Sequence, residues 1–187
     1  VDLKDLTPIL PNLYLWQGDI TRLAVDVIVN AANSKLLGCF VPNHSCIDNA
    51  IHTAAGVELR LACHELMQEQ GRDETTGQAK ITKAYNLPSR YVLHTVGPII
   101  YEEVTELEKR QLASSYEACL TLAYEKDLRS LAFCCVSTGE FRFPNEEAAK
   151  IAIETVLQFQ KEHPDMVVIF NVFKDIDYTI YQALLKK

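Results

Sequence analysis

Short apolar runs alternate with helical periods along almost the whole chain, and this alternation limits the possible folds more than any other feature. Strands are expected over residues 13–16, 25–29, 79–84, 91–96, 131–136 and 166–170. Helices are expected over residues 46–55, 57–70 and 107–123, from 144 onward, and over 175–185. The run Leu131–Val136 is apolar throughout, which is typical of a strand buried on both faces. This order predicts an α/β fold in which helices enclose a mostly parallel sheet.

The length of 187 residues fits a single domain with one core, and residues 1–187 contain no repeat, low-complexity tract or linker. The longest apolar stretches are strand-sized, so no membrane span is expected. Val1–Lys4 shows no signal-peptide pattern, and Cys134 and Cys135 lie in an apolar run, as reduced core cysteines do. These features favour a cytoplasmic protein. Because the first residue is not Met, an N-terminal extension that is missing from this sequence stays open.

The formal net charge is −7, and no three basic residues follow one another. A protein that grips nucleic acid needs a basic face, because Lys and Arg supply most of its affinity for the phosphate backbone. Nucleic acid is therefore not expected as a partner. A small anionic ligand is compatible with this charge, since backbone amides at helix N-termini bind phosphates without a basic surface.

In a parallel sheet, ligands bind beyond the carboxyl ends of the strands, and three strand ends here carry unusual loops. In the loop after Val29, the residues Cys39, His44 and Cys46 lie close together. Two thiolates and an imidazole suit Zn²⁺, and a set of three protein ligands leaves a position for water or substrate. Unrelated loop residues, or a disulfide between the two cysteines, would explain the same spacing.

Three further histidines in the chain need no metal to explain them. His52 and His64 lie at helical spacings and are compatible with plain helix residues. His94 lies inside an expected strand, where a hydrogen-bonded structural histidine is favoured over a metal ligand.

The loop after Val136 joins a buried strand to a helix N-terminus, where unpaired backbone N–H groups and the helix dipole attract an anion. Gly139 permits a close approach of the backbone or a positive φ. An ordinary strand-to-helix loop explains these residues equally well. After the third strand end, Phe173 either stacks on a base or covers the core.

Four sequence motifs occur in the order found in the macrodomain family and together span nearly the whole chain. They are Gln17–Thr21, Val29–Ser34, Ile47–His52 with Ala54–Gly56, and Ser137–Gly139 ahead of Phe143-Pro144. The chain therefore resembles that family, which implies a three-layer α/β/α macrodomain with a mixed, mostly parallel central sheet. Macrodomains usually carry a glycine run before the Asp of the third motif. Residues 38–46 replace that run here, which resembles the zinc-dependent subfamily of microbial ADP-ribosyl hydrolases.

The resemblance implies roles at one end of an ADP-ribose site for Asp19 and Ile20, and at the other for Asn33 and Asp48. Asp19 would accept from the adenine amino group, with the backbone of Ile20 beside it. Asn33 would contact the distal ribose, and Asp48 would orient the ribose or help to activate a water. From the residues alone, Asp19 could be only the N-cap of a short helical turn, and Asp48 an acid favoured by the helix dipole.

The resemblance also implies that the loop after Val136 cradles the diphosphate and part of the distal ribose. Its expected ligand-binding residues are Ser137, Thr138, Gly139, Glu140, Phe141 and Phe143, with Phe173 at the adenine. Many relatives have Gly where Arg142 stands, so Arg142 either reaches the diphosphate or faces water.

The expected function is a monomeric, zinc-dependent hydrolase that removes mono-ADP-ribose from modified protein side chains, with Asn33 and Asp48 as catalytic residues and Cys39, His44 and Cys46 as metal ligands. Its expected partners are ADP-ribose and ADP-ribosylated protein. Two alternatives stay open: a reader module that binds ADP-ribose without cleavage, and a deacylase acting on O-acyl-ADP-ribose.

Overall fold

The structure is a computed structural model that describes residues 1–36, 46–139 and 141–186. Its six strands are β1 (Leu13–Gln17), β2 (Val27–Ala31), β3 (Ala79–Lys83), β4 (Tyr91–Thr95), β5 (Ser130–Phe133) and β6 (Val167–Val172). Its α-helices are α1 (Ile47–Ala55), α2 (Val57–Gln70), α3 (Glu106–Glu125), α4 (Asn145–Glu162) and α5 (Asp175–Leu185). Short 3-10 turns, η1 and η2, cover Leu3–Asp5 and Ile20–Arg22. Every strand and helix expected from the alternation is present.

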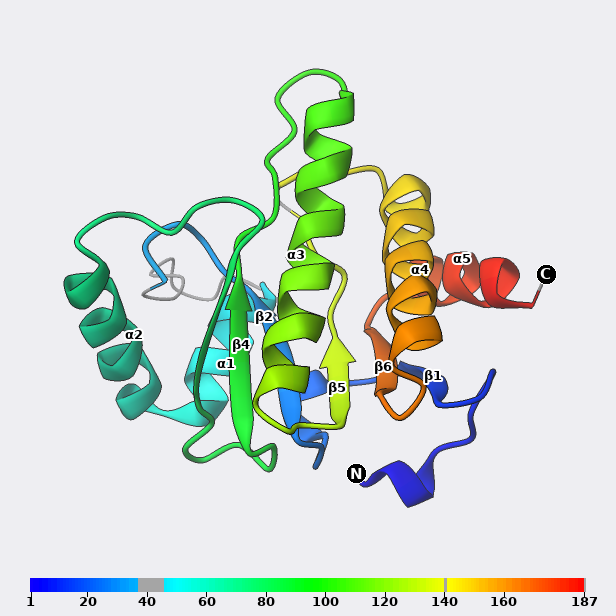
Figure 1. The fold of residues 1–187 in the computed structure, drawn as a ribbon, viewed down its shortest axis with the longest axis horizontal. Helices are drawn as coiled ribbons and strands as arrows, with labels where there is room; N and C mark the ends of the chain where they lie inside the picture. Colours follow the sequence, from blue (N-terminus) through cyan, green and yellow to red (C-terminus); the bar gives the residue numbers. More distant parts are fainter. Residues whose placement is uncertain (37–45, 140, 187) are drawn as a thin grey trace.

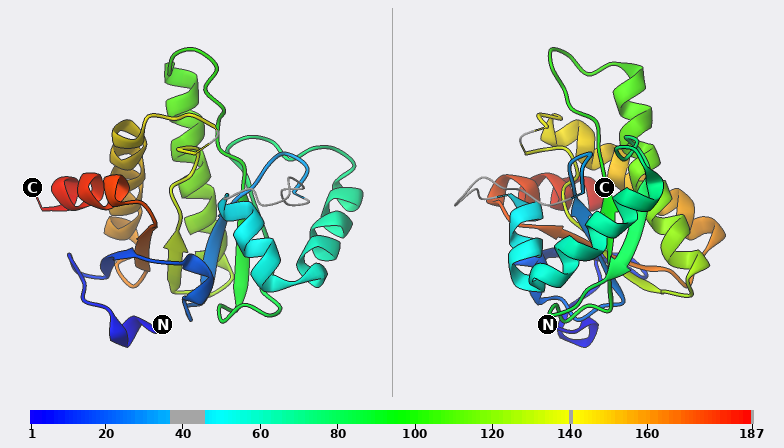
Figure 2. Two further views of the ribbon diagram at one scale, coloured as in Figure 1. Left: turned by 180° about the vertical axis from the view of Figure 1, so that it is seen from behind. Right: turned by 90° about the vertical axis from the view of Figure 1, so that its left-hand side faces the viewer.

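The six strands form one sheet in the order β1-β6-β5-β2-β4-β3. All neighbouring pairs are parallel except β3 with β4, so the prediction of a mixed, mostly parallel sheet is confirmed. Helices α3 and α4 lie side by side on one face, and α1 and α2 lie on the other (Figures 1 and 2). Helix α5 packs against β1 and β6. This is the three-layer arrangement.

The core lies between these layers and is continuous from β1 to β4. Residues of β2 and β5 are almost all fully buried, as expected for central strands covered on both faces. The rings of Tyr116 and Phe133 lie 4.6 Å apart, and those of Phe170 and Tyr181 lie 5.1 Å apart. Among the described residues, no helix is long and apolar enough to cross a membrane.

Strand β5 ends at Phe133, three residues before the end of its apolar run. The hydroxyl group of Tyr116 explains the early end, because it donates to Cys134 O and accepts from Val136 N, both at 3.4 Å. The Tyr116 hydroxyl group thus serves as the hydrogen-bond partner that a neighbouring strand would otherwise provide for Cys134 and Val136. Beyond this point the backbone leaves the sheet and leads to α4. Burial raises the pKa of the Cys134 thiol to about 12, so this cysteine is a protonated core residue, as its apolar surroundings predict.

Candidate functional site

Five parallel strands place their carboxyl ends at one edge of the sheet, and the predicted site residues follow these ends (Figure 1). Strands β1 and β6 are neighbours, with Gln17 opposite Val172. Strands β2 and β4 are neighbours at the other side of the same edge, with Asn30 opposite His94. We call the first group the Asp19 end and the second the Asp48 end.

At the Asp19 end, Asp19 is exposed and caps the turn η2. Its Oδ1 atom accepts from Thr21 N at 3.0 Å and from Thr21 Oγ1 at 2.6 Å. Asp19 is therefore the N-cap of this turn, as the residues alone indicated. Both bonds use the same oxygen atom, which leaves Oδ2 in a position to accept from a ligand. Ile20 is buried, so only its backbone can face the site.

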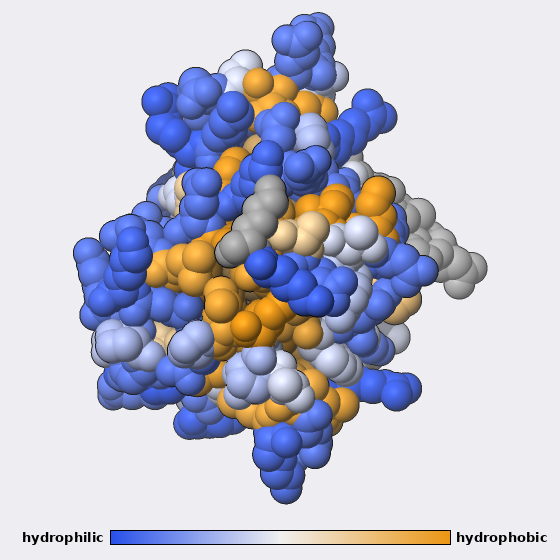
Figure 3. All heavy atoms as spheres, turned by 90° about the vertical axis from the view of Figure 1, so that its right-hand side faces the viewer, coloured by the Kyte–Doolittle hydropathy of each residue, from blue (hydrophilic) through white to orange (hydrophobic). Residues whose placement is uncertain are grey.

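Phe173 lies beside this group and is 76% exposed, so the interpretation as a cover over the core is wrong. Gln17 links the end of β1 to the loop after β6, because its Nε2 atom donates to Phe173 O at 3.2 Å and to Asp175 Oδ1 at 2.8 Å. Figure 3 views the side where α5 and the C-terminus lie, and apolar residues gather in the middle of that face. An exposed ring at a strand end is what a stacked base requires.

A buried asparagine supports the Asp19 end from within the sheet. Asn171, the last residue but one of β6, is 4% exposed. Its Nδ2 atom donates to Gly18 O at 3.1 Å, and Gly18 N donates to Val172 O at 2.9 Å. These bonds fix the backbone directly before Asp19.

The loop after β5 is held by its own backbone. Phe143 N donates to Ser137 O at 2.9 Å, and Arg142 N donates to Gly139 O at 3.0 Å. Phe143 is buried in the core and anchors the loop, while Phe141 O accepts from Ile100 N at 2.7 Å. Thr138 Oγ1 donates to Cys135 O at 3.2 Å. Glu140 lies outside the described residues.

Two residues of this loop adopt the left-handed conformation, Ser137 with φ 67° and Arg142 with φ 66°. Ser137 is buried, and its hydroxyl group has no hydrogen-bond partner among the described residues. A side-chain carbon at Gly97 would overlap that hydroxyl group, so glycine is required there. A positive φ favours glycine, so the backbone at Arg142 would suit the glycine expected from the family resemblance better than it suits an arginine.

At the Asp48 end, Asp48 lies in the first turn of α1 and is 5% exposed. Its Oδ1 atom accepts from Asn30 Nδ2 at 2.8 Å and lies 3.4 Å from His52 Nε2. Asn33 is half-buried, and its Oδ1 accepts from Lys35 N at 3.1 Å. The structure therefore brings Asn30 and Asp48 together beneath the loop that carries Asn33.

Burial dominates the electrostatics of the Asp48 end. It raises the pKa of Asp48, while the hydrogen bond from Asn30 and the positive charge of Arg60 lower it. Burial and the same arginine lower the pKa of His52 to about 4. Burial lowers the pKa of His94 to about 3. Both imidazoles are thus neutral at physiological pH, and a carboxyl group with a raised pKa in such a place is suited to proton transfer.

The ligand atoms of His52, Cys63 and His94 lie within 4.8 Å of one another, which is a possible metal geometry. Hydrogen bonds occupy His94 instead: Nδ1 lies 3.2 Å from Asn30 Nδ2, and Nε2 lies 3.0 Å from Thr82 Oγ1. Burial raises the pKa of the Cys63 thiol to about 12, so it is protonated. The prediction that His94 is a hydrogen-bonded structural histidine is confirmed.

Of the predicted metal ligands, Cys39 and His44 lie outside the described residues. Cys46 is the N-cap of α1, and its Sγ accepts from Asn49 N at 3.3 Å. A helix N-terminus stabilises a thiolate, which is the form that binds zinc. Cys46 precedes Asp48 by two residues, so both side chains belong to the N-terminal end of α1.

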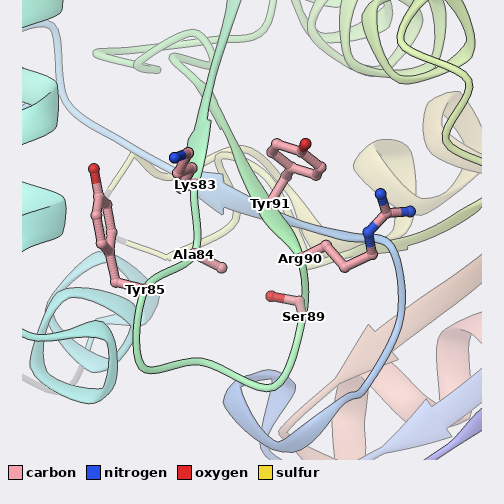
Figure 4. Close-up of a pocket in the computed structure, with 6 residues that line it drawn as sticks. All are labelled: Lys83, Ala84, Tyr85, Ser89, Arg90 and Tyr91. Atoms are coloured by element: carbon pink, nitrogen blue, oxygen red, sulfur yellow. The ribbon is translucent and has the colours of Figure 1, made fainter.

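A shallow hollow at the opposite edge of the sheet is unrelated to this site. It lies at the β3–β4 hairpin and is lined by Lys83, Ala84, Tyr85, Ser89, Arg90 and Tyr91 (Figure 4). Tyr85 and Tyr91 lie on opposite sides of the strand that carries Lys83 and Ala84, and the labelled polar groups do not converge on one point. It has no feature of a catalytic centre.

The sequence prediction missed the contact between Asn30 and His94 and its place beneath Asp48. Each is a polar residue inside an apolar strand, which was the available signal. Their contact depends on the pairing of β2 with β4, and these strands are far apart in the sequence.

The Macro domain family model matches residues 29–152, and the chain belongs to this family. A protein-ADP-ribose hydrolase of Staphylococcus aureus (strain MRSA252) is 54% identical over 189 residues, covering 100% of this chain and 71% of the relative. One of Treponema medium is 53% identical over 188 residues, covering 98% and 72%.

Solved structures agree with this assignment. An Oceanobacillus iheyensis macrodomain with ADP has a TM-score of 0.87 and 41% identity, covering 97% of this chain and 94% of that chain. A Trypanosoma brucei macrodomain in complex with ADP-ribose has a TM-score of 0.85 and 36% identity, covering 99% and 76%. The predicted fold class is confirmed.

Proposed function

We propose that this protein is a hydrolase that releases mono-ADP-ribose from modified protein side chains. The observation that carries the proposal is the buried Asp48 carboxyl group, held 2.8 Å from Asn30 Nδ2 at the same sheet edge as Asp19 and Phe173. The hydrolase names of relatives that are 53–54% identical to the chain support it. A reader module would need the Asp19 end but would gain nothing from a pKa-shifted acid.

ADP-ribose would lie along the sheet edge with its adenine between Asp19 and Phe173. Backbone N–H groups of Ser137–Gly139 would hold the diphosphate near the start of α4. Asn33 would then hold the distal ribose, and Asp48 would orient the ribose or take a proton from the attacking water. The attacking water adds at the anomeric carbon, the bond to the protein side chain breaks, and the side chain leaves with a proton.

The hydrolase is further proposed to depend on zinc, with Cys39, His44 and Cys46 as ligands. Two cysteines and a histidine match the preference of this ion, and Cys46 lies two residues before the proposed catalytic residue Asp48. A bound zinc ion supplies Lewis acidity, which polarises a ligand oxygen or lowers the pKa of a bound water. Elemental analysis should find about one Zn²⁺ per chain, and loss of occupancy in Cys39→Ala plus Cys46→Ala.

The deciding experiment incubates an auto-ADP-ribosylated protein with this chain, with and without a chelator, and follows the released ADP-ribose. Release that the chelator abolishes supports both parts of the proposal. Release that persists in metal-depleted protein supports the hydrolase and rejects the zinc. Tight binding of ADP-ribose without release from any acceptor makes the chain a reader, and cleavage of O-acyl-ADP-ribose alone makes it a deacylase.

A further inference from the structure

The side-chain amide of Asn30 lies in the interior of the sheet, directly beneath Asp48. Asn30 is the last residue but one of β2 and has no exposed surface. Its Nδ2 atom lies 2.8 Å from Asp48 Oδ1 and 3.2 Å from His94 Nδ1. An amide nitrogen carries two hydrogens, so each of these acceptors receives one.

His94 fixes the rotation of this amide. Its Nδ1 atom accepts from Asn30, and its Nε2 atom lies 3.0 Å from Thr82 Oγ1. Burial keeps the imidazole neutral, so it carries one N–H group, and that group lies at Nε2. The opposite tautomer would place an N–H group against the Asn30 amide hydrogens. The chain of bonds therefore runs from His94 through Asn30 to Asp48.

Asn30 is a poor choice for stability alone. Its Oδ1 atom is buried and has no hydrogen-bond partner among the described residues. A buried acceptor without a partner is unfavourable, and an apolar side chain would suit a central strand better. The asparagine is therefore useful for its hydrogen bond to Asp48, because this bond gives the buried carboxyl group a donor.

We infer that Asn30 is a positioning residue for Asp48 and that His94 holds Asn30 in the orientation this requires. The inference rests on the proposed hydrolase function, since it assigns Asn30 to the reaction rather than to ligand affinity. Asn30 has no exposed surface and donates to Asp48, so it would act through that carboxyl group and not on the ligand directly. Its loss should lower kcat and leave the dissociation constant for ADP-ribose nearly unchanged.

The first test is Asn30→Asp, which keeps the shape of the side chain and removes both donors. It should lower kcat roughly 10- to 100-fold and change the Kd for ADP-ribose by less than about 3-fold. Asn30→Ala, which adds no charge beside Asp48, should show the same division. Unchanged kcat in both folded variants overturns the inference.

Asn171 provides a matched control, since it is also a buried asparagine at the last position but one of its strand. It donates to Gly18 O beside Asp19, so Asn171→Asp should raise Kd and leave the single-turnover rate at saturation close to wild type. Equal loss of rate in the two asparagine variants would mean that a general disturbance of the sheet is responsible, and would reject a specific role for Asn30.

A pair of His94 variants keeps the test decisive if the Asn30 variants do not fold. His94→Asn offers a carbonyl oxygen close to the place of Nδ1, so it should retain most of kcat. His94→Leu has no acceptor and should lower kcat as the Asn30 variants do. Equal rates in the two His94 variants would contradict the proposed role of the acceptor.

Nitrogen-15 NMR separates this inference from the hydrolase proposal, because it needs no activity. Wild-type His94 should be the Nε2-protonated tautomer, and Asn30→Asp should move the proton to Nδ1. If wild type releases no ADP-ribose, the hydrolase proposal fails and the tautomer alone decides whether the network exists. An Nδ1-protonated His94 in wild type overturns the inference even in an active enzyme.

Discussion

The two ends of the site are built in opposite ways. Asp19 is exposed and is held by a residue two positions away, Thr21. Asp48 is 5% exposed and is held by Asn30 from another strand, at 2.8 Å. An exposed carboxylate binds a ligand group without a large desolvation cost, whereas a buried one changes its proton affinity. The comparison teaches that the Asp19 end is suited to affinity and the Asp48 end to chemistry.

The largest expected effect is on stability and belongs to the Asp48 end. His52 and His94 have folded-state pKa values of about 4 and about 3, below the ordinary value of 6.5. The unfolded chain therefore binds more protons below pH 6.5, and stability falls as the pH falls through this range. Between pH 7.5 and pH 5, each histidine should lower the free energy of unfolding by about 2 kcal/mol.

Urea unfolding at the two pH values measures this loss. The raised pKa of Asp48 acts in the opposite direction, because its proton uptake on acidification favours the folded state. His52→Gln should remove about half of the loss. Equal stability of wild type at pH 7.5 and pH 5 would show that the Asp48 end is not a dry, neutral cluster.

The next largest effect concerns the rate. Asp48→Ala should lower kcat for ADP-ribose release by about two orders of magnitude, the usual range for loss of an acid or base group. Calorimetry should show a much smaller change in affinity for free ADP-ribose, since Asp19 and the loop from Ser137 to Phe143 remain. Asn33→Ala should have an intermediate effect, because Asn33 is proposed to touch the ribose before and during the reaction. If Asp48→Ala lost affinity for ADP-ribose and kept its kcat, Asp48 would be a binding residue and not a catalytic one.

At the other end, Asp19→Ala should weaken ADP-ribose binding by about 10- to 150-fold, the equivalent of about 1.5–3 kcal/mol for a hydrogen bond to a charged group. An inosine analogue of ADP-ribose, which lacks the adenine amino group, should bind wild type about as weakly as ADP-ribose binds the variant. Unchanged calorimetric affinity in Asp19→Ala, or equal binding of both ligands to wild type, would remove Asp19 from the adenine site.

The smallest effect tests the loop between the two ends. Arg142 has φ 66°, so Arg142→Gly should raise the free energy of unfolding by about 0.5–1 kcal/mol. Lys150→Gly, an exposed position within α4, should lower it by about 1 kcal/mol and controls for glycine itself. Thermal unfolding compares the two variants. A loss of ADP-ribose affinity in Arg142→Gly would assign the guanidinium group to the diphosphate.

The elements of the fold were predictable because each depends on local patterns. The apolar run at Leu131–Val136 marked a buried strand, although its early end at Phe133 was not predictable, since it depends on Tyr116 from α3. The three strand-end loops were also found, because the carboxyl ends of parallel strands meet at one edge.

The buried residues that hold the site in place were harder to predict than the residues expected to contact the ligand. Asp19 and Asp48 belong to motifs that are continuous in the sequence, so the resemblance to macrodomains was enough to predict both as site residues. Asn30 meets His94 only through the register of β2 with β4, and Asn171 meets Gly18 only through the pairing of β1 with β6. Such contacts depend on strand order, which a single sequence does not encode locally.

The most direct test of the division between the two ends is a double-mutant cycle in kcat/KM with Asp48→Ala and Asp19→Ala. If one end supplies the rate and the other the affinity, the double variant should lose the sum of the two single losses, within about 0.5 kcal/mol. Additivity, together with a rate loss confined to Asp48→Ala and an affinity loss confined to Asp19→Ala, is the predicted result. A coupling energy well above that limit would show that the two carboxyl groups act as one unit, and would contradict the account.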